Sequence, residues 1–234
     1  MPKRPALLSK CCRSAELACN LLNLFAMRIA VIGTGNVGQQ LARAFSSVGH
    51  EVVFGTRDPH SETSQALAET MDAGMASPRE AAQSADLVAL AVPGQAVLDT
   101  AQTLGDLSGT IVIDPTNPVG PGLLPPASGD ERSQAERLAD LLPGARVVKA
   151  FNTLAAEHMT QGHLGGRPIA LFVCGDDAEA KTVLMGMASD LGFEPVDVGG
   201  LDRARLTEPL ALVWITLAVR GGYGRNFAFS LTRG

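Results

Sequence analysis

Residues 28–49, RIAVIGTGNVGQQLARAFSSVG, decide the fold, because a short apolar run leads through a glycine-rich turn into a helical pattern. The run consists of β-branched and small apolar residues, as in a strand that is buried on both faces. After the turn, Leu41, Ala42 and Phe45 recur at the spacing of one helix face, and Gly49 follows as a stop. The segment therefore predicts a strand, a tight turn and a helix, which is the opening unit of an α/β domain.

The turn, Gly33-Thr34-Gly35-Asn36-Val37-Gly38, has the spacing G-x-G-x-x-G between a strand and a helix. In such a turn the first glycine permits the bend, the second lets a pyrophosphate approach the backbone, and the third lets the helix pack on the strand. Free N–H groups and the helix dipole attract the anion. All the residues of the turn are candidate contacts of a dinucleotide, and a glycine-rich turn without a ligand is the alternative.

The end of the second strand, Gly55-Thr56-Arg57, selects the nucleotide. An acidic residue at this place hydrogen-bonds the ribose 2′-hydroxyl of NAD, whereas an arginine pairs with the 2′-phosphate of NADP. Thr56 adds a hydroxyl donor beside the guanidinium. We therefore predict that Thr56 and Arg57 bind NADP(H), with a preference over NAD of about ten- to a hundredfold. The alternative for Arg57 is a solvated side chain paired with Asp58, and a methyltransferase is disfavoured because it would need an acid here.

Apolar runs and helical patterns alternate along the rest of the chain, which predicts an α/β fold of the Rossmann type, with a doubly wound, mostly parallel sheet. We assign residues 27–234 to one NADP-binding domain with a small C-terminal extension. Strands are expected at 28–33, 51–56, 74–76, 86–92, 110–115, 146–151, 168–174 and 194–199. Helices are expected at about 36–47, from Pro78 onward, at 176–191 and at 207–219, with a long proline- and glycine-rich loop at 115–130.

In an open α/β sheet, ligands bind at the loops that follow the strands. Three such loops, 92–95, 114–118 and 149–153, are rich in Asn and Thr and poor in titratable groups. Val92 and Pro93 in the first of them are candidate cofactor contacts. Lys149 is the one basic residue in these loops, and it is either a proton donor or a snorkelling or ion-paired lysine.

No catalytic acid or base stands out, so the catalytic residues remain unknown. The four histidines are scattered, no zinc spacing or paired carboxylate motif is present, and Tyr223 lacks the lysine that short-chain dehydrogenases place four residues later. Transfer of a hydride between two planar rings needs stacking and hydrogen-bond donors rather than a general acid. The sequence suits a reaction of that kind.

Composition narrows the remaining possibilities. The chain has 234 residues and a formal charge of −5, with no basic run in its body, so nucleic acid is not an expected partner. The apolar run 209–219 is too short to span a bilayer, so we expect no membrane anchor. Residues 1–26 contain three of the four cysteines and are expected to be a tail preceding a functional start at Met27. With Cys174 alone in the body, a reducing cytoplasm is predicted.

The motifs GTGNVG, FGTRDP, DPTNP, VVKAFNT, CGDDAEAK, GFEPVDVG, WITLA and GRNFAF together resemble those of NADPH:coenzyme F420 oxidoreductases, over nearly the whole chain from Met27. The core motifs also resemble the nucleotide-binding domain of six-transmembrane metalloreductases, whose membrane helices this sequence lacks. The resemblance implies hydride transfer between NADPH C4 and a deazaflavin C5, and a homodimer formed through the terminal region. It implies that Thr34, Thr56 and Arg57 hold the NADP phosphates and that Asn117, Asn152 and Thr153 are candidates for the acceptor-ring site.

Other readings stay open. The small-molecule hydride acceptor could be coenzyme F420, FMN, FAD or an imine, as in pyrroline-5-carboxylate reductase, although those enzymes append a large helical domain and here only about 35 residues follow Val198. A non-catalytic NADP(H)-sensing module is also compatible with the scarcity of acid/base residues. The stretch 221–226 is either part of the acceptor site, with Arg225 facing an anionic group, or a C-terminal turn.

Overall fold

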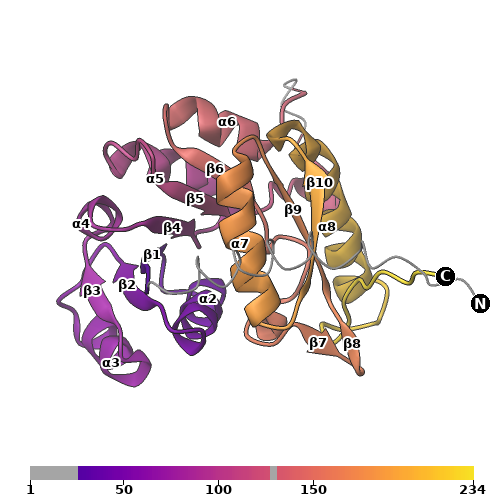
Figure 1. Cartoon of the computed structure of the whole chain (residues 1–234), viewed down its shortest axis with the longest axis horizontal. Helices are drawn as coiled ribbons and strands as arrows, with labels where there is room; N and C mark the ends of the chain where they lie inside the picture. The colour runs from indigo at the N-terminus through magenta and orange to yellow at the C-terminus, as the bar shows by residue number, and fades with distance from the viewer. Residues whose placement is uncertain (1–25, 127–130) are drawn as a thin grey trace, which may run out of the picture.

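The computed structural model describes residues 26–126 and 131–234, which form a three-layer α/β structure around one twisted sheet (Figure 1). The strand order in the sheet is β10-β9-β6-β5-β4-β1-β2-β3. Its strands are β1 (Arg28–Ile32), β2 (Glu51–Gly55), β3 (Gly74–Ala76), β4 (Leu87–Leu90), β5 (Ile111–Asp114), β6 (Arg146–Lys149), β9 (Ala170–Gly175) and β10 (Glu194–Gly199). A separate antiparallel pair, β7 (His163–Leu164) and β8 (Arg167–Pro168), lies outside it.

The six strands from β6 to β3 are parallel, and the pair β9–β10 runs antiparallel to them, because β9 pairs with β6 in the opposite direction. The chain reverses its direction of progress across the sheet at β1, which lies between β2 and β4. In doubly wound sheets the ligand crevice opens at this switch point. The predicted Rossmann-type fold is therefore confirmed.

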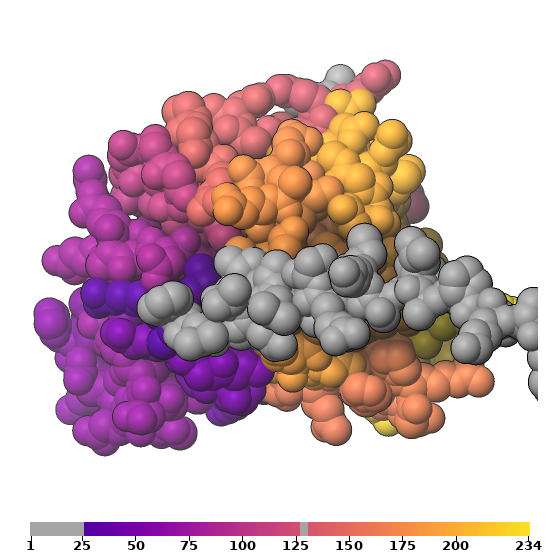
Figure 2. All heavy atoms as spheres, in the orientation of Figure 1, coloured from indigo at the N-terminus to yellow at the C-terminus, as the bar shows by residue number. Residues whose placement is uncertain are grey.

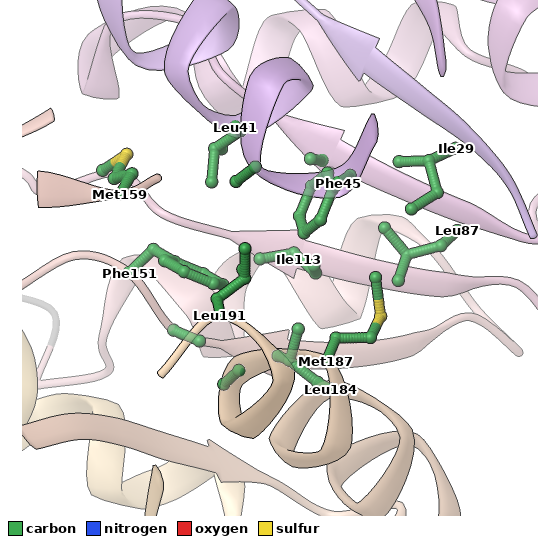
Figure 3. Close-up of a cluster of buried hydrophobic side chains, with 14 of the residues drawn as sticks. Ile29, Leu41, Phe45, Leu87, Ile113, Phe151, Met159, Leu184, Met187 and Leu191 are labelled. Carbon is green, nitrogen blue, oxygen red and sulfur yellow. The ribbon is translucent and has the colours of Figure 1, made fainter. Parts of the chain in front are cut away.

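Helices cover both faces of the sheet. The helices are α2 (Asn36–Ser47), α3 (Glu62–Met71), α4 (Pro78–Gln83), α5 (Val97–Thr103), α6 (Gln134–Leu141), α7 (Ala178–Asp190) and α8 (Ala204–Val219). The core under α2 and α7 contains Phe45, Phe151 and Met187, whose side chains converge in Figure 3. A second core on the other face is built under α4, α5 and α6. In space-filling view the N-terminal half of the described chain lies at one end of the molecule and the C-terminal half at the other (Figure 2).

Local signals place the element ends. Ser77 caps α4 through a capping box with Glu80, and Pro78 occupies the first turn, where its missing N–H costs nothing. The side chain of Asp177 caps α7 by accepting from the N–H of Ala180, so that helix begins two residues later than the expected 176. The predicted helix 207–219 begins earlier, at Ala204, because a 3-10 turn at Leu201–Arg203 leads directly into it.

The strand expected at 146–151 ends at Lys149, because Phe151 takes the left-handed backbone conformation, with φ of +62°. The strand expected at 168–174 is divided into β8 and β9. The loop expected at 115–130 is largely irregular and carries one short 3-10 turn, Pro121–Leu123, in its described part. The tail expected at residues 1–26 lies outside the described residues, apart from Ala26. None of the helices in the described ranges combines the length and the hydropathy needed to cross a membrane.

Candidate functional site

The turn after β1 is held by close backbone contacts that only glycine permits. Gly33 has φ of +115°, and a Cβ on it would lie 2.4 Å from the carbonyl oxygen of Ala91 at the end of β4. A Cβ on Gly38 would lie 2.1 Å from the carbonyl oxygen of Gly33, so the first turn of α2 packs directly on the end of β1. The N–H of Gly33 donates to the carbonyl of Gly55 at 2.9 Å, which ties the turn to β2.

The middle of the turn is open on its outer side. Gly35 is the N-cap of α2, no side chain accepts from the helix N-terminus, and a Cβ on Gly35 would meet no atom within 4 Å. The side-chain amide of Gln39 donates through Nε2 to the carbonyl of Thr34 at 2.9 Å, which helps to hold the loop in this conformation. Uncapped N–H groups, a helix dipole and free space at Gly35 are what a pyrophosphate requires, so the residues present fit a dinucleotide.

A cleft of about 400 Å³ joins this turn to the ends of β2 and β4. Seven of the residues chosen from the sequence line it together: Gly33, Thr34, Gly35, Thr56, Arg57, Val92 and Pro93. Asn36, Val37 and Gly38 stand just outside the lining, in the first turn of α2. Sequence reasoning did not select Pro78, Ala96 and Thr100, which come from α4 and the start of α5 and close the cleft on its far side.

Arg57 is exposed at the rim of the cleft. Within the part of the chain that the structure describes, it makes no ion pair with Asp58, the alternative that the sequence left open. A guanidinium that is always charged and not engaged by a carboxylate is available to a phosphate. The geometry thus brings Arg57 and Thr56 to one cleft with the phosphate-binding turn.

The loops after β5 and β6 meet through two side-chain amides. Asn117 donates through Nδ2 to the carbonyl of Asn152 at 2.8 Å, and Asn152 donates through Nδ2 to Asn117 Oδ1 at 3.0 Å. Nδ2 of Asn152 also donates to the carbonyl of Thr207 in α8 at 3.0 Å. Asn152 and Thr153 are 5% and 3% exposed, so both lie below the surface of this pair of loops.

Oδ1 of Asn152 is buried and finds no hydrogen-bond donor among the described residues. The residue before it, Phe151, is a buried aromatic side chain on a left-handed backbone, a conformation that costs about 1–3 kcal/mol and is concentrated at functional sites. Edge-to-face contacts with Phe45 and Phe193 hold the Phe151 ring in place. The left-handed backbone at Phe151 therefore sets the direction that the chain takes at Asn152, after the end of β6.

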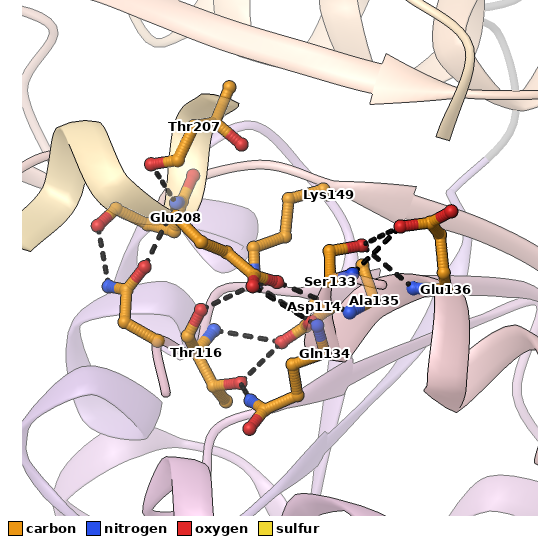
Figure 4. A network of polar contacts seen from close by, with 11 residues as sticks. Asp114, Thr116, Ser133, Gln134, Ala135, Glu136, Lys149, Thr207 and Glu208 are labelled. Carbon is orange, nitrogen blue, oxygen red and sulfur yellow. Dashed lines mark hydrogen bonds and ion pairs between the residues drawn. The ribbon is translucent and has the colours of Figure 1, made fainter. Parts of the chain in front are cut away.

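Lys149, at the end of β6, is fully buried in a polar network (Figure 4). Its ammonium lies 2.9 Å from Asp114 Oδ2 and 3.0 Å from Glu208 Oε1, and it donates to the carbonyl of Thr116 at 2.6 Å. Burial by itself lowers the pKa of Lys149, but the two carboxylates outweigh it and hold that pKa above its ordinary value. Of the alternatives that the sequence left open for Lys149, the structure shows the ion-paired lysine.

Glu208 is the member of this network that sequence reasoning missed. Its carboxylate accepts hydrogen bonds from the backbone N–H groups of Gln134 and Ala135, in the first turn of α6, at 3.1 and 3.2 Å. In the sequence, Glu208 could have been found because it is an acid within the otherwise largely apolar helix α8. A buried carboxylate in such a helix requires a buried cation, and Lys149 is the cation in the adjacent strand.

Arg225 does not face the cleft. It forms a two-pronged ion pair with Glu157, with distances of 2.9 to 3.2 Å, just after β6 and its loop. The chain after α8 is then anchored by Phe227, whose ring stacks on Trp214 and whose carbonyl accepts from the indole N–H at 3.1 Å. Of the two alternatives left open for 221–226, the one in which Arg225 faces an anionic ligand is not what the structure shows, because an internal carboxylate pairs with it.

Cys174 is a buried free thiol at the end of β9. Burial raises its pKa to about 11, so it is protonated and unreactive at neutral pH. In residues 26–126 and 131–234, no three His, Cys, Asp or Glu side chains gather in a way that could hold a metal ion. The site offers binding and orientation rather than a nucleophile or an acid.

Comparisons with known proteins identify the family of the chain. Residues 28–118 match the family described as NADP oxidoreductase coenzyme F420-dependent. The F420-dependent NADP reductase of Methanothermobacter thermautotrophicus is 32% identical over 232 residues, covering 91% of this chain and 97% of that protein. The rat metalloreductase STEAP3 is 32% identical over 187 residues, but the chain spans only 37% of its length.

Comparison with solved structures points to the same family. A structure from Arthrobacter sp. FB24, provisionally assigned as an F420-dependent NADP reductase, has a TM-score of 0.80 and 33% identity, covering 89% of this chain and all of that one. An imine reductase from Aspergillus terreus shares the fold alone, with a TM-score of 0.59 and 20% identity. The chain therefore belongs to the F420-dependent NADP oxidoreductase family, and it is an NADP-dependent oxidoreductase.

Proposed function

We propose that this protein transfers hydride between NADP(H) and the deazaflavin coenzyme F420. The observation that carries the proposal is the Asn117–Asn152 pair, which lies at the carboxyl ends of β5 and β6 and leaves one buried acceptor, Asn152 Oδ1, without a donor. A buried acceptor without a partner is costly, so a ligand that donates to it gains affinity. The relatives named as F420-dependent NADP reductases supply the chemical identity of the second substrate.

The roles of the residues follow from their places. The turn Gly33–Gly38 would bind the pyrophosphate, and Thr56 with Arg57 would bind the 2′-phosphate. Val92 and Pro93 would line the nicotinamide side of the cleft, and Asn117, Asn152 and Thr153 would orient the rings. The nicotinamide supplies or takes the hydride. Because only a hydride moves between planar rings, the protein needs to align them and exclude water rather than supply an acid or base.

The decisive test is an anaerobic assay of the purified protein with NADPH and one acceptor at a time: F420, FMN or FAD. We expect rapid loss of the visible absorbance of F420 alone. Rapid reduction of FMN or FAD instead would indicate a flavin reductase. NADPH binding without reduction of any acceptor would favour the redox-sensing alternative and overturn the proposed hydride transfer to F420.

We also propose that the protein is a homodimer and that it works in the cytoplasm. The dimer proposal is supported by an apolar groove between α8 and the loop before α6, lined by Leu123, Leu124, Pro125, Pro209, Leu212, Val213, Thr216 and Leu217. Leu124 and Val213 are 65% and 51% exposed there. The cytoplasmic proposal is supported by Cys174, a free thiol that is protected from oxidation only by burial and a reducing medium.

A further inference from the structure

The buried network contains more negative than positive charge. Asp114, Lys149 and Glu208, here called the buried triad, place two carboxylates against one ammonium, at 0%, 0% and 5% exposure. An arrangement with equal charges would need only one of the acids. The triad therefore carries one excess negative charge inside the protein.

Both carboxylates are surrounded by hydrogen-bond donors. Asp114 Oδ1 accepts from the N–H and the hydroxyl of Thr116, at 2.9 and 2.6 Å, while its Oδ2 faces Lys149. Glu208 accepts from two backbone N–H groups of α6 and faces the same ammonium. A protonated acid would need an acceptor, and these partners are donors. The dipole of α6 offsets about half a charge at Glu208, which leaves an excess of about half to one negative unit.

The triad adjoins the Asn117–Asn152 pair, the candidate ring site. Asp114 and Lys149 are the last residues of β5 and β6. Asn117 and Asn152 lie in the loops that follow these strands, and the carbonyl that holds Asn152 belongs to Thr207, the neighbour of Glu208. The nearest exposed cation on α8, Arg205, is already engaged by Glu136 through two hydrogen bonds. The excess charge is thus buried next to the loops that carry Asn117 and Asn152.

We propose that the buried triad biases the nucleotide site toward NADP+, whose nicotinamide ring carries a positive charge that NADPH lacks. The inference rests on the proposed function, because it requires the nicotinamide to lie at the carboxyl ends of β5 and β6. For half to one excess charge within about 10 Å of the ring, at an effective dielectric constant of about 20, the bias is about three- to fifteenfold in relative affinity. The bias favours reduction of the nucleotide's partner by bound NADPH.

The test compares two dissociation constants in each of two variants, Glu208→Gln and Asp114→Asn. Binding of NADPH is followed by its fluorescence, and NADP+ by competition against it. The ratio Kd(NADP+)/Kd(NADPH) is the readout, because both nucleotides share the same phosphates and any general damage to the cleft cancels. We expect the ratio to rise about three- to fifteenfold in each folded variant, as judged by thermal melting.

Glu136→Gln is the matched control, because it removes a carboxylate of α6 that is paired with Arg205 outside the triad. We expect its ratio to equal that of the wild type. The wild-type ratio should also stay constant between about 0.02 and 0.5 M salt, since buried charges are screened little. A ratio that is unchanged in the triad variants, or that drifts toward one with salt in the wild type, overturns the proposal. Failure of the wild type to bind NADPH would overturn the proposed function instead.

Discussion

At the scale of single residues, Arg57 is expected to set the choice of nucleotide. It is exposed at the rim of the cleft and lies next to Thr56 in the loop that follows β2. Replacing Arg57 by Ala should lower the preference for NADPH over NADH about ten- to a hundredfold, because a charge-assisted phosphate contact is worth about 1.5–3 kcal/mol. Dissociation constants or kcat/KM for both nucleotides measure the change.

The control for this prediction is Arg43→Ala. Arg43 is an exposed arginine on α2 that does not line the cleft, so its removal changes the net charge equally. We expect it to leave the NADPH/NADH preference unaltered. An Arg57→Ala protein that discriminates as well as the wild type would show that another group reads the 2′-phosphate.

Two glycines give opposite predictions for the same substitution. Gly38→Ala places a methyl group against the backbone of Gly33, which cannot move without opening the turn. We expect loss of nucleotide binding and a fall in unfolding free energy of about 2 kcal/mol or more. Gly186→Ala, in the middle of α7, meets no atom within 4 Å and should raise stability by about 0.5–1 kcal/mol. Denaturant unfolding measures both, and a stabilising Gly38→Ala would contradict the close packing.

The residues of the phosphate turn could be predicted from sequence because their pattern is local and each glycine has a steric reason. The partners of Lys149 could not, because Asp114 lies 35 residues before it and Glu208 comes from the last helix. The periodicity of α8 shows an apolar helix and gives no hint of which strand its single buried acid meets. Asn117 and Asn152 could be chosen by position, but their mutual hydrogen bonds depend on the crossing of two loops.

At the scale of elements, the N-terminus of α6 makes stability depend on acid pH. Glu136 completes a capping box with Ser133 and pairs with Arg205 of α8. The hydrogen bond from Arg205 and those from Ser133 lower the pKa of Glu136 to about 2 despite partial burial. Because the folded pKa is below the unfolded one, the stability from this group is complete above about pH 4.5 and is lost as the pH falls toward 2.

Glu136→Gln removes this contribution at all pH values. We expect the variant to be less stable than the wild type by about 1–3 kcal/mol at pH 7, and the difference to shrink between about pH 4.5 and 2. Urea unfolding of both proteins across this range gives the comparison. Asp99→Asn, an exposed acid in the first turn of α5 with no pairing arginine in the described chain, serves as the control and should show little pH-dependent difference. A constant gap between wild type and Glu136→Gln would contradict the assignment.

The sequence predicted which strands and helices exist more readily than it predicted the residues at which they begin and end. β6 stops at Lys149 because Phe151 is left-handed, a tertiary requirement that no local propensity reveals in a β-favouring VVKAF segment. The start of α8 was obscured in the same way, since the 3-10 turn before it has no apolar period. Where caps are local, as at Ser77 and Asp177, the sequence placed the start within a residue or two.

At the scale of the whole molecule, the apolar groove along α8 predicts self-association. Val213 is 51% exposed on the outer face of the helix, and its neighbours in the groove are apolar apart from Thr216. Contiguous apolar surface of this kind is covered in most soluble proteins, and a two-fold axis would place one α8 against another. We expect the 24.3 kDa chain to have twice that mass in light scattering at micromolar concentration.

Val213→Lys should shift this equilibrium to the monomer, with a dimer dissociation constant at least tenfold higher, because an ammonium would be desolvated at the centre of the contact. Leu231→Lys is the matched control, since Leu231 is also exposed, at 41%, but lies outside α8. Its mass should remain that of the wild type. Both proteins should still bind NADPH, because the cleft at Gly33, Thr56 and Arg57 is formed within one chain. If the wild-type protein stays monomeric at all concentrations, the two-fold assembly is excluded and the groove must be covered by a different partner.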